Sequence, residues 1–91
     1  MNSRTTRRFR DLLAELPEQV RNQAREAYRL FEQNPAHPSL CFKRVHDKRP
    51  IYSARISLDY RAVGTMFGDE IVWFWVGSHA EYDRVLQSLR G

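Results

Sequence analysis

The spacing of apolar residues changes from helical in the first third of the chain to alternating in the rest. Two sets of apolar positions recur every three or four residues, the spacing of an amphipathic helix. The first set is Phe9, Leu12, Leu13 and Leu16, and the second is Val20, Ala24, Ala27, Tyr28 and Phe31. They predict one helix over residues 3 to 16 and another that ends near residue 33. Pro17 ends the first helix and suits the first turn of the second, so the two should form an antiparallel hairpin.

Beyond the second helix the pattern becomes typical of β-structure. Residues 34 to 39 include two prolines that disfavour helical geometry, and they predict a loop. Apolar residues then alternate with polar ones. We expect strands at residues 40 to 46, 51 to 57, 60 to 67 and 71 to 76, with turns between them. No connection is long enough for a helical crossover, so these four strands should form an antiparallel meander.

A strong strand is followed directly by a strong helix start near the C-terminus. Residues 71 to 76 are all β-branched or aromatic, which predicts a central strand covered on both faces. Ser78 and Glu81 then have the spacing of a reciprocal capping box, which begins a helix. His79 and Tyr82 therefore lie on the first turn of that helix, just beyond the end of the strand.

These elements predict one α+β domain over residues 1–91. Two N-terminal helices, arranged as a helical hairpin, should pack on a four-stranded antiparallel sheet, with a third helix at the C-terminus. No run of the sequence approaches the length needed to cross a bilayer, and no export signal is apparent, so we expect a cytoplasmic protein with no membrane contact. The one cysteine, Cys41, excludes an internal disulfide, and no Cys/His cluster has zinc spacing. We expect no metal and no cofactor.

Positive charge is concentrated in two segments. The net charge is +4, from 15 Lys and Arg against 11 Asp and Glu. The first segment holds Arg4, Arg7, Arg8 and Arg10, and the second holds Lys43, Arg44, His46, Lys48 and Arg49. Such clusters either bind an anionic partner, usually nucleic acid, or only solvate a helix face and a turn. On the first interpretation, the second segment binds the phosphates of RNA.

The alternation of the second strand separates a core face from a face that is free for chemistry. If the helices cover Tyr52, Ala54 and Ile56, then Ser53, Arg55 and Ser57 face the other way. Arg61, at the start of the next strand, shares a face with Arg55 if the turn between them holds three residues, whereas a one-residue slip places it on the other side. We expect the shared face. His79 should reach the same edge of the sheet.

Such a set contains the groups needed for metal-independent RNA cleavage. The 2′-hydroxyl must lose a proton as it attacks the neighbouring phosphate, the extra charge must be matched, and the leaving 5′-oxygen must gain a proton. Histidine moves protons near neutral pH, and arginine can grip two phosphate oxygens. We therefore expect Arg61, His79 and Arg55 as catalytic residues, with Tyr82 stacking on a base or donating its hydroxyl.

Each of these residues also has a structural interpretation. Tyr82 has the position of a core residue on an amphipathic helix, and His79 could be an exposed first-turn residue. Arg61 could form an ion pair with Asp59 or Glu70. The two tryptophans of the apolar strand are more typical of a core than of a base-stacking platform. Residue types alone support a basic α+β domain with a candidate site.

Two stretches of the sequence carry a family resemblance. The succession YSARISLDYRAV, the turn at Gly68-Asp69 and the succession IVWFWVGSHAEYDRVL together resemble the RelE/ParE superfamily of bacterial type II toxins. The most specific features are the Tyr60-Arg61 pair and the order strand, glycine, basic residue and tyrosine that ends at Tyr82. The resemblance implies a fold of two N-terminal helices, a four-stranded antiparallel sheet and a C-terminal helix, as the periodicity also predicts.

The resemblance also implies an activity and partners. RelE-like toxins cleave messenger RNA in the ribosomal decoding site and are held inactive by a cognate antitoxin. Arg61 matches the family's arginine at the scissile phosphate, and His79 matches the basic residue with an acid/base or charge-stabilising role. Tyr82 corresponds to the helix tyrosine that orients RNA, and Arg55 lies near the basic positions of the second strand. The antitoxin is expected to wrap the basic face as an extended or helical segment.

Departures from the RelE pattern leave two other functions open. Ser53 and Ala54 stand where active relatives often carry lysine or arginine, and the spacing from Gly77 to Tyr82 is one residue shorter. ParE-like relatives poison DNA gyrase without cleaving RNA, and in that case the functional residues would lie on the C-terminal helix or the sheet edge. A third interpretation is a nucleic-acid-binding relative that has lost toxicity.

Overall fold

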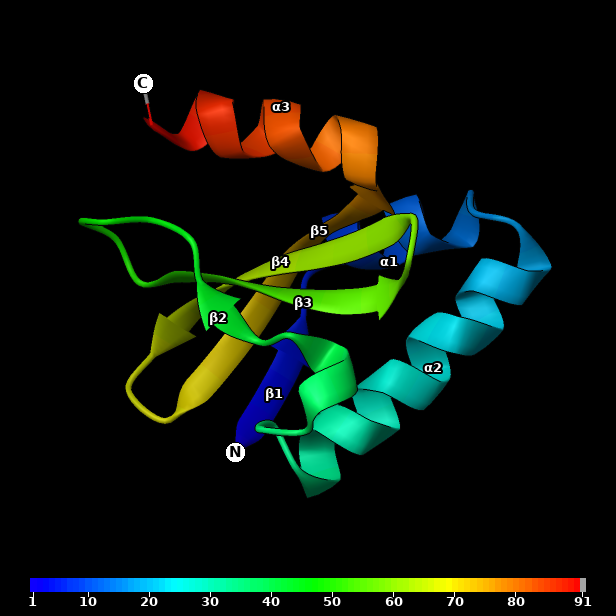
Figure 1. Cartoon of the computed structure of the whole chain (residues 1–91), viewed down its shortest axis with the longest axis horizontal. Coiled ribbons are helices and arrows are strands. Elements are labelled where there is room, and N and C mark those ends of the chain that lie inside the picture. The colour runs from blue at the N-terminus through cyan, green and yellow to red at the C-terminus, as the bar shows by residue number, and fades with distance from the viewer. Residues whose placement is uncertain (91) are drawn as a thin grey trace.

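The structure, a computed structural model, describes residues 1–90, which form three α-helices, a short 3-10 helix and one five-stranded sheet (Figure 1). Along the chain these are β1 (Asn2–Thr5), α1 (Arg7–Ala14), α2 (Glu18–Gln33), η1 (Pro38–Leu40), β2 (Lys43–Arg44), β3 (Ile51–Ser57), β4 (Tyr60–Phe67), β5 (Glu70–Ser78) and α3 (His79–Arg90). The strand order is β1-β5-β4-β3-β2. Neighbouring strands are antiparallel except for the parallel pair β1 and β5. The predicted α+β architecture is confirmed.

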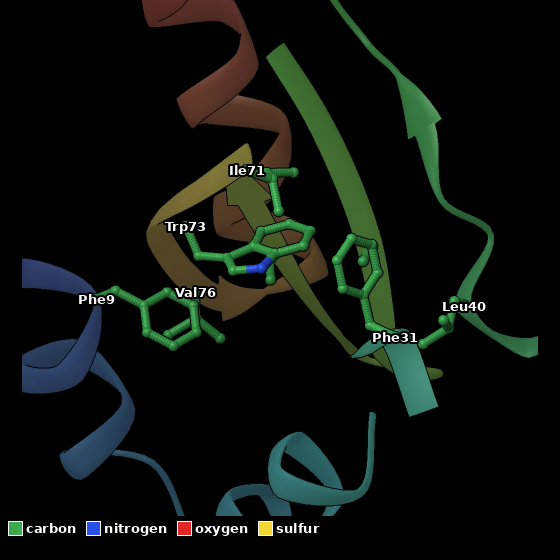
Figure 2. Close-up of a cluster of buried hydrophobic side chains, with 8 residues drawn as sticks. Phe9, Phe31, Leu40, Ile71, Trp73 and Val76 are labelled. Atoms are coloured by element: carbon green, nitrogen blue, oxygen red, sulfur yellow. The ribbon is translucent and has the colours of Figure 1, made fainter. Parts of the chain in front are cut away.

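Helices α1 and α2 cover one face of the sheet. Trp73 lies at the centre of the cluster beneath them, with Phe9 of α1 on one side and Phe31 of α2 on the other (Figure 2). The Phe31 ring meets the Trp73 indole edge-on, with centroids 5.4 Å apart. Ala54 belongs to the same cluster, and its β3 neighbours Tyr52 and Ile56 pack against it. The predicted core face of β3 is therefore confirmed.

Helix α3 packs against the opposite face of the sheet. Its inner side chains contact a second buried cluster, whose members are Ile51, Val63, Trp75 and Tyr82. Strand β5 thus has neighbouring strands on both edges and packed side chains on both faces. This arrangement confirms that β5 is a central strand covered on both faces, as its continuous apolar run predicted. Both tryptophans are buried, as expected for core residues.

A bulge in β5 explains how that strand supplies both clusters. Val63 pairs with Trp75 whereas the next residue, Gly64, pairs with Trp73, so Phe74 is the extra residue. Residues two apart on a regular strand share a face, but an inserted residue reverses this relation. Trp73 consequently packs under α1 and α2, and Trp75 packs under α3.

The prediction that a helix begins near residue 3 was wrong, because residues 2 to 5 form a strand. β1 runs parallel to β5, with Asn2 opposite Glu70 and Thr5 opposite Trp73. The helix begins after Thr6, whose Oγ1 accepts a hydrogen bond from the Phe9 backbone N–H over 3.1 Å. β1 covers the edge of β5, which is the most apolar strand and would otherwise expose unpaired backbone groups. The sheet has five strands instead of four.

The prediction of a long strand over residues 40 to 46 was also wrong. Pro38–Leu40 form the 3-10 turn, and only Lys43–Arg44 pair with β3. Cys41 lies between these two pieces with a φ of 45°, the left-handed conformation. Such a residue interrupts a strand because its backbone groups turn out of the ladder direction. Much of the outer edge of β3 is therefore not covered by β2.

Candidate active site

The register of β2, β3 and β4 places four polar side chains on the α3 side of the sheet. Arg55 pairs with Arg61, and Lys43 pairs with Ser53. Directly opposite residues of an antiparallel pair point to the same face. The expectation that Arg55 and Arg61 share a face is confirmed. The turn between the strands holds two residues, and an irregularity between Arg55 and Ser57 restores the register.

The first turn of α3 is fixed at the edge of this polar face. The backbone N–H of His79 donates to the carbonyl of Asp59, in the β3–β4 turn, over 2.7 Å. The Glu81 N–H donates to Ser78 Oγ over 3.2 Å, and the Ser78 N–H is 3.4 Å from Glu81 Oε1. These contacts are the predicted capping box. They tie the start of the helix to the β3–β4 turn and to the end of β5, and thereby hold His79 at the edge of the sheet.

These elements enclose a pocket of about 140 Å³. It is lined by Cys41, Lys43, Ser53, Arg55, Arg61, His79 and Tyr82. Three of the lining side chains carry a fixed positive charge, and none is acidic. A concave site with charge of one sign concentrates ions of the other sign. The pocket is therefore suited to a phosphate or another small anion.

Arg61 carries a buried cationic atom at the pocket. Its Nη1 is fully buried and has no hydrogen-bond partner among residues 1–90. Its two candidate ion-pair partners are not engaged with it: Glu70 instead lies 3.6 Å from Arg4, and Asp59 forms no ion pair in the described part of the chain. A buried charged donor without a partner is unfavourable. An anion entering the pocket would remove this penalty.

His79 contributes the one imidazole among the residues that line the pocket. Its side chain is half exposed, and its Nδ1 lies 3.9 Å from Oδ2 of Asp83, one helical turn further along α3. The ring centroid is 5.6 Å from that of Tyr82. His79 thus presents a partly exposed imidazole at the wall of a cationic pocket.

Tyr82 lies deeper than the other candidates. Only 7% of its surface is exposed, and it belongs to the cluster under α3. Its hydroxyl donates to Ser53 Oγ over 3.2 Å in a buried hydrogen bond. Tyr82 is a core residue, as the amphipathic pattern of α3 allowed, and it also forms part of the pocket lining.

The structure divides the basic segment of residues 43 to 49, which begins with β2. Of its five candidate residues, Lys43 alone lines the pocket. Arg44 pairs with Tyr52, and its Nε donates to the carbonyl of His46 over 2.9 Å. Lys48 and Arg49 are exposed in the turn that follows. This segment therefore brings one phosphate-binding candidate, Lys43, to the pocket, and the other four lie outside it.

His46 lies outside the pocket and makes hydrogen bonds that support the fold. Its Nδ1 accepts backbone N–H groups of Lys48 and Arg49 over 3.1 and 2.9 Å. Its Nε2 lies 3.2 Å from the carbonyl oxygen of Leu89, near the end of α3. The side chain is 9% exposed. His46 thus connects the β2–β3 turn to the C-terminal helix.

Sequence reasoning did not identify Ser53 or Cys41 as site residues. The alternation of β3 placed Ser53 on the correct face but gave no reason to distinguish it from a solvent-facing serine. Its contact with Tyr82 joins residues 29 positions apart. Cys41 reaches the pocket only because the chain adopts a left-handed conformation there, which no hydrophobic pattern signals.

Neither a metal cluster nor a membrane span is found in the described chain. Across residues 1–90, no three His, Cys, Asp or Glu side chains lie close enough together to hold a metal ion. None of the helices in this range is long and apolar enough to cross a membrane.

A comparison of sequences identifies the family. Residues 18–84, which include β3 to β5 and the first turn of α3, match the ParE-like toxin domain. The chain belongs to this family. Its expected membership of the RelE/ParE toxin superfamily is thereby confirmed. No curated protein matches the sequence at a significant level.

Solved structures of RelE/ParE toxins share the fold. RelE in the RelB–RelE antitoxin–toxin complex of Methanococcus jannaschii superposes with a TM-score of 0.71 at 18% identity, over 88% of this chain and 95% of that one. For YafQ of E. coli strain BL21(DE3) the TM-score is 0.68 at 12% identity, over 89% and 96% of the two chains. The YoeB/ParE toxin of Agrobacterium tumefaciens gives 0.67 at 15% identity, over 87% and 99%. At these identities the likeness concerns the fold.

Proposed function

We propose that this ParE-like chain is a metal-independent endoribonuclease that cleaves messenger RNA on the ribosome and so inhibits translation. The observation that carries the proposal is the buried, unpartnered Nη1 of Arg61 in a pocket shared with two other cations and a histidine. A gyrase inhibitor that acts by surface contact needs no such pocket. Phosphoryl transfer does, because the charge that develops on phosphorus must be matched.

The proposed reaction is transesterification within the RNA strand. The 2′-oxygen attacks the adjacent phosphorus, the bond to the 5′-oxygen breaks, and a 2′,3′-cyclic phosphate forms. Arg61 and Arg55 bind the non-bridging oxygens as their charge increases, with Lys43 as the third cation. The 2′-hydroxyl loses one proton and the 5′-oxygen gains one. His79 makes one of these transfers, and solvent water makes the other.

The partners follow from this assignment. The substrate is mRNA held by the ribosome, so the protein acts in the cytoplasm. The inhibitory partner is a cognate antitoxin, as RelE of Methanococcus jannaschii and RelE of Pyrococcus horikoshii were both crystallised with RelB. A segment that neutralises this chain should carry carboxylates that reach Lys43, Arg55 or Arg61. Such a segment competes with the RNA phosphate for the same cations.

Inhibition of DNA gyrase is the second candidate function. The observation in its favour is that the matching family is the ParE-like toxin domain. This function would depend on exposed residues of α3 such as Arg84 instead of the pocket. Arg84→Ala would then relieve growth arrest, whereas His79→Ala would not.

The test is to induce the chain in a bacterial host, record growth and map the 5′ ends of cellular transcripts. The His79→Ala variant is compared with His37→Ala, a histidine that lies outside the pocket. We expect growth arrest with new cuts in translated frames, lost in His79→Ala and retained in His37→Ala. Arrest with intact mRNA and DNA damage signalling would identify the gyrase function. Normal growth with salt-sensitive RNA binding would identify a non-toxic nucleic-acid-binding relative.

A further inference from the structure

Ser53 is a buried polar residue in an otherwise apolar set. It is 2% exposed, and apart from Tyr82 and the two tryptophans it is the one buried residue of the described chain whose side chain carries a polar group. Ser53 lies on β3 between Ile51 and Arg55, on the face that supplies the pocket. A buried hydroxyl is unfavourable unless it is hydrogen-bonded. Its hydroxyl oxygen accepts a hydrogen bond from the hydroxyl of Tyr82, 3.2 Å away.

This hydrogen bond joins the sheet to the turn of α3 that carries His79. Tyr82 follows His79 by three positions, which places the two side chains on neighbouring parts of one helix face. Their ring centroids are 5.6 Å apart. The hydrogen bond from His79 to Asp59 and the capping box at Ser78 fix the backbone where α3 begins. The apolar contacts that α3 makes beyond this point are not directional and would tolerate a small rotation of the helix. A buried hydrogen bond is directional and is strengthened by its low-dielectric surroundings.

We infer that Ser53 and Tyr82 are positioning residues, whose buried hydrogen bond fixes the first turn of α3 and so holds His79 at the wall of the pocket that contains Arg61. Neither residue needs to touch the RNA. The effect of these two residues on catalysis rests on the proposed ribonuclease function. The positioning of His79 itself can be measured without any RNA.

The burial of Tyr82 separates this role from a substrate-binding one. A ring that stacks on a base must present an open face, but the Tyr82 ring is 7% exposed. A tyrosine that bound the substrate through its hydroxyl would mainly raise KM when that hydroxyl is removed. A positioning tyrosine would mainly lower kcat, because small errors in the placement of a catalytic group reduce the rate steeply.

The experiment compares Tyr82→Phe, Ser53→Ala and the double variant in the full chain. Tyr52→Phe is the matched control, because Tyr52 lies on the other face of β3 and its ring stacks on Phe42. Circular dichroism and thermal unfolding establish that each variant is folded. Cleavage of mRNA on ribosomes gives kcat and KM, and NMR of isotope-labelled protein records the ring resonances of His79 without RNA.

We expect Tyr82→Phe to lower kcat about tenfold, with KM within about twofold, and to shift or broaden the His79 ring resonances. The double variant should lose no more than the larger single loss, because both substitutions break one bond. Tyr52→Phe should change neither measurement. Unaltered His79 resonances in folded Tyr82→Phe would overturn the inference, as would a change confined to KM. If the wild-type chain cleaves no RNA, the proposed function fails, while the resonances still decide the positioning role.

Discussion

Arg55 and Arg61 stand directly opposite each other on β3 and β4, and within residues 1–90 no acidic side chain forms an ion pair with either. Like charges in such a cross-strand pair repel each other. The fold therefore holds an unfavourable pair at the site where the proposed reaction needs positive charge. Functional sites commonly retain such conflicts at the expense of stability.

Removing one charge of this pair should stabilise the protein and impair its function. We expect Arg55→Gln to raise the free energy of unfolding by about 0.2–1 kcal/mol, measured by urea denaturation. Added inorganic phosphate should stabilise the wild type more than the variant, because the variant binds the anion less well. Lower stability of Arg55→Gln would show that the guanidinium makes a favourable contact and would contradict the repulsion.

Gly77 should be intolerant of any side chain. It pairs with Arg61, and a Cβ added there would lie 2.6 Å from Cζ2 of the buried Trp75 indole. Because Trp75 is packed under α3, it cannot move away freely. We expect Gly77→Ala to reduce the free energy of unfolding by about 1–3 kcal/mol.

The control for this prediction is Gly68→Ala, whose added Cβ would meet nothing within 4 Å although its backbone φ is +61°. Loss of stability at Gly68 would report backbone strain. Loss at Gly77 would report displacement of the indole, visible as a change in tryptophan fluorescence. An unchanged emission spectrum in Gly77→Ala would contradict the steric account.

His46 should support stability and not catalysis. Its ring connects the turn at Lys48 and Arg49 to the end of α3 at Leu89. We expect His46→Ala to lower the free energy of unfolding by about 1–2 kcal/mol, with the cleavage rate of the folded variant within about twofold of wild type. A large loss of RNA affinity without loss of stability would instead support the phosphate-binding role that the sequence suggested.

The elements with strong periodicity could be predicted from sequence, and those defined by distant partners could not. Helix α2, strands β3 to β5 and the capping box at Ser78 follow from local spacing and local chemistry. β1 is four residues long and becomes a strand only because β5, some 70 positions away, offers an edge. The short β2 depends on the left-handed turn at Cys41, for which the sequence has no glycine as a signal.

The candidate site could be predicted from the sequence in part. The alternation of β3 and the position of His79 after Gly77 brought Arg55, Arg61 and His79 to one edge. The basic segment of residues 43 to 49 was less informative, because a run of charges does not reveal which side chain faces a pocket. Only the tertiary structure separates Lys43, which lines the pocket, from His46, which holds the turn.

The most direct test of the ribonuclease account is the rate of mRNA cleavage in a purified translation system with wild-type chain and with Arg61→Ala. Arg8→Ala, an exposed arginine on α1, is the control for loss of charge. We predict cleavage on translating ribosomes that falls about 10²–10³-fold in folded Arg61→Ala, since a preorganised charge at the reacting phosphate is lost, and is unchanged in Arg8→Ala. Intact mRNA with the wild-type chain, or equal cleavage by Arg61→Ala, would contradict the account.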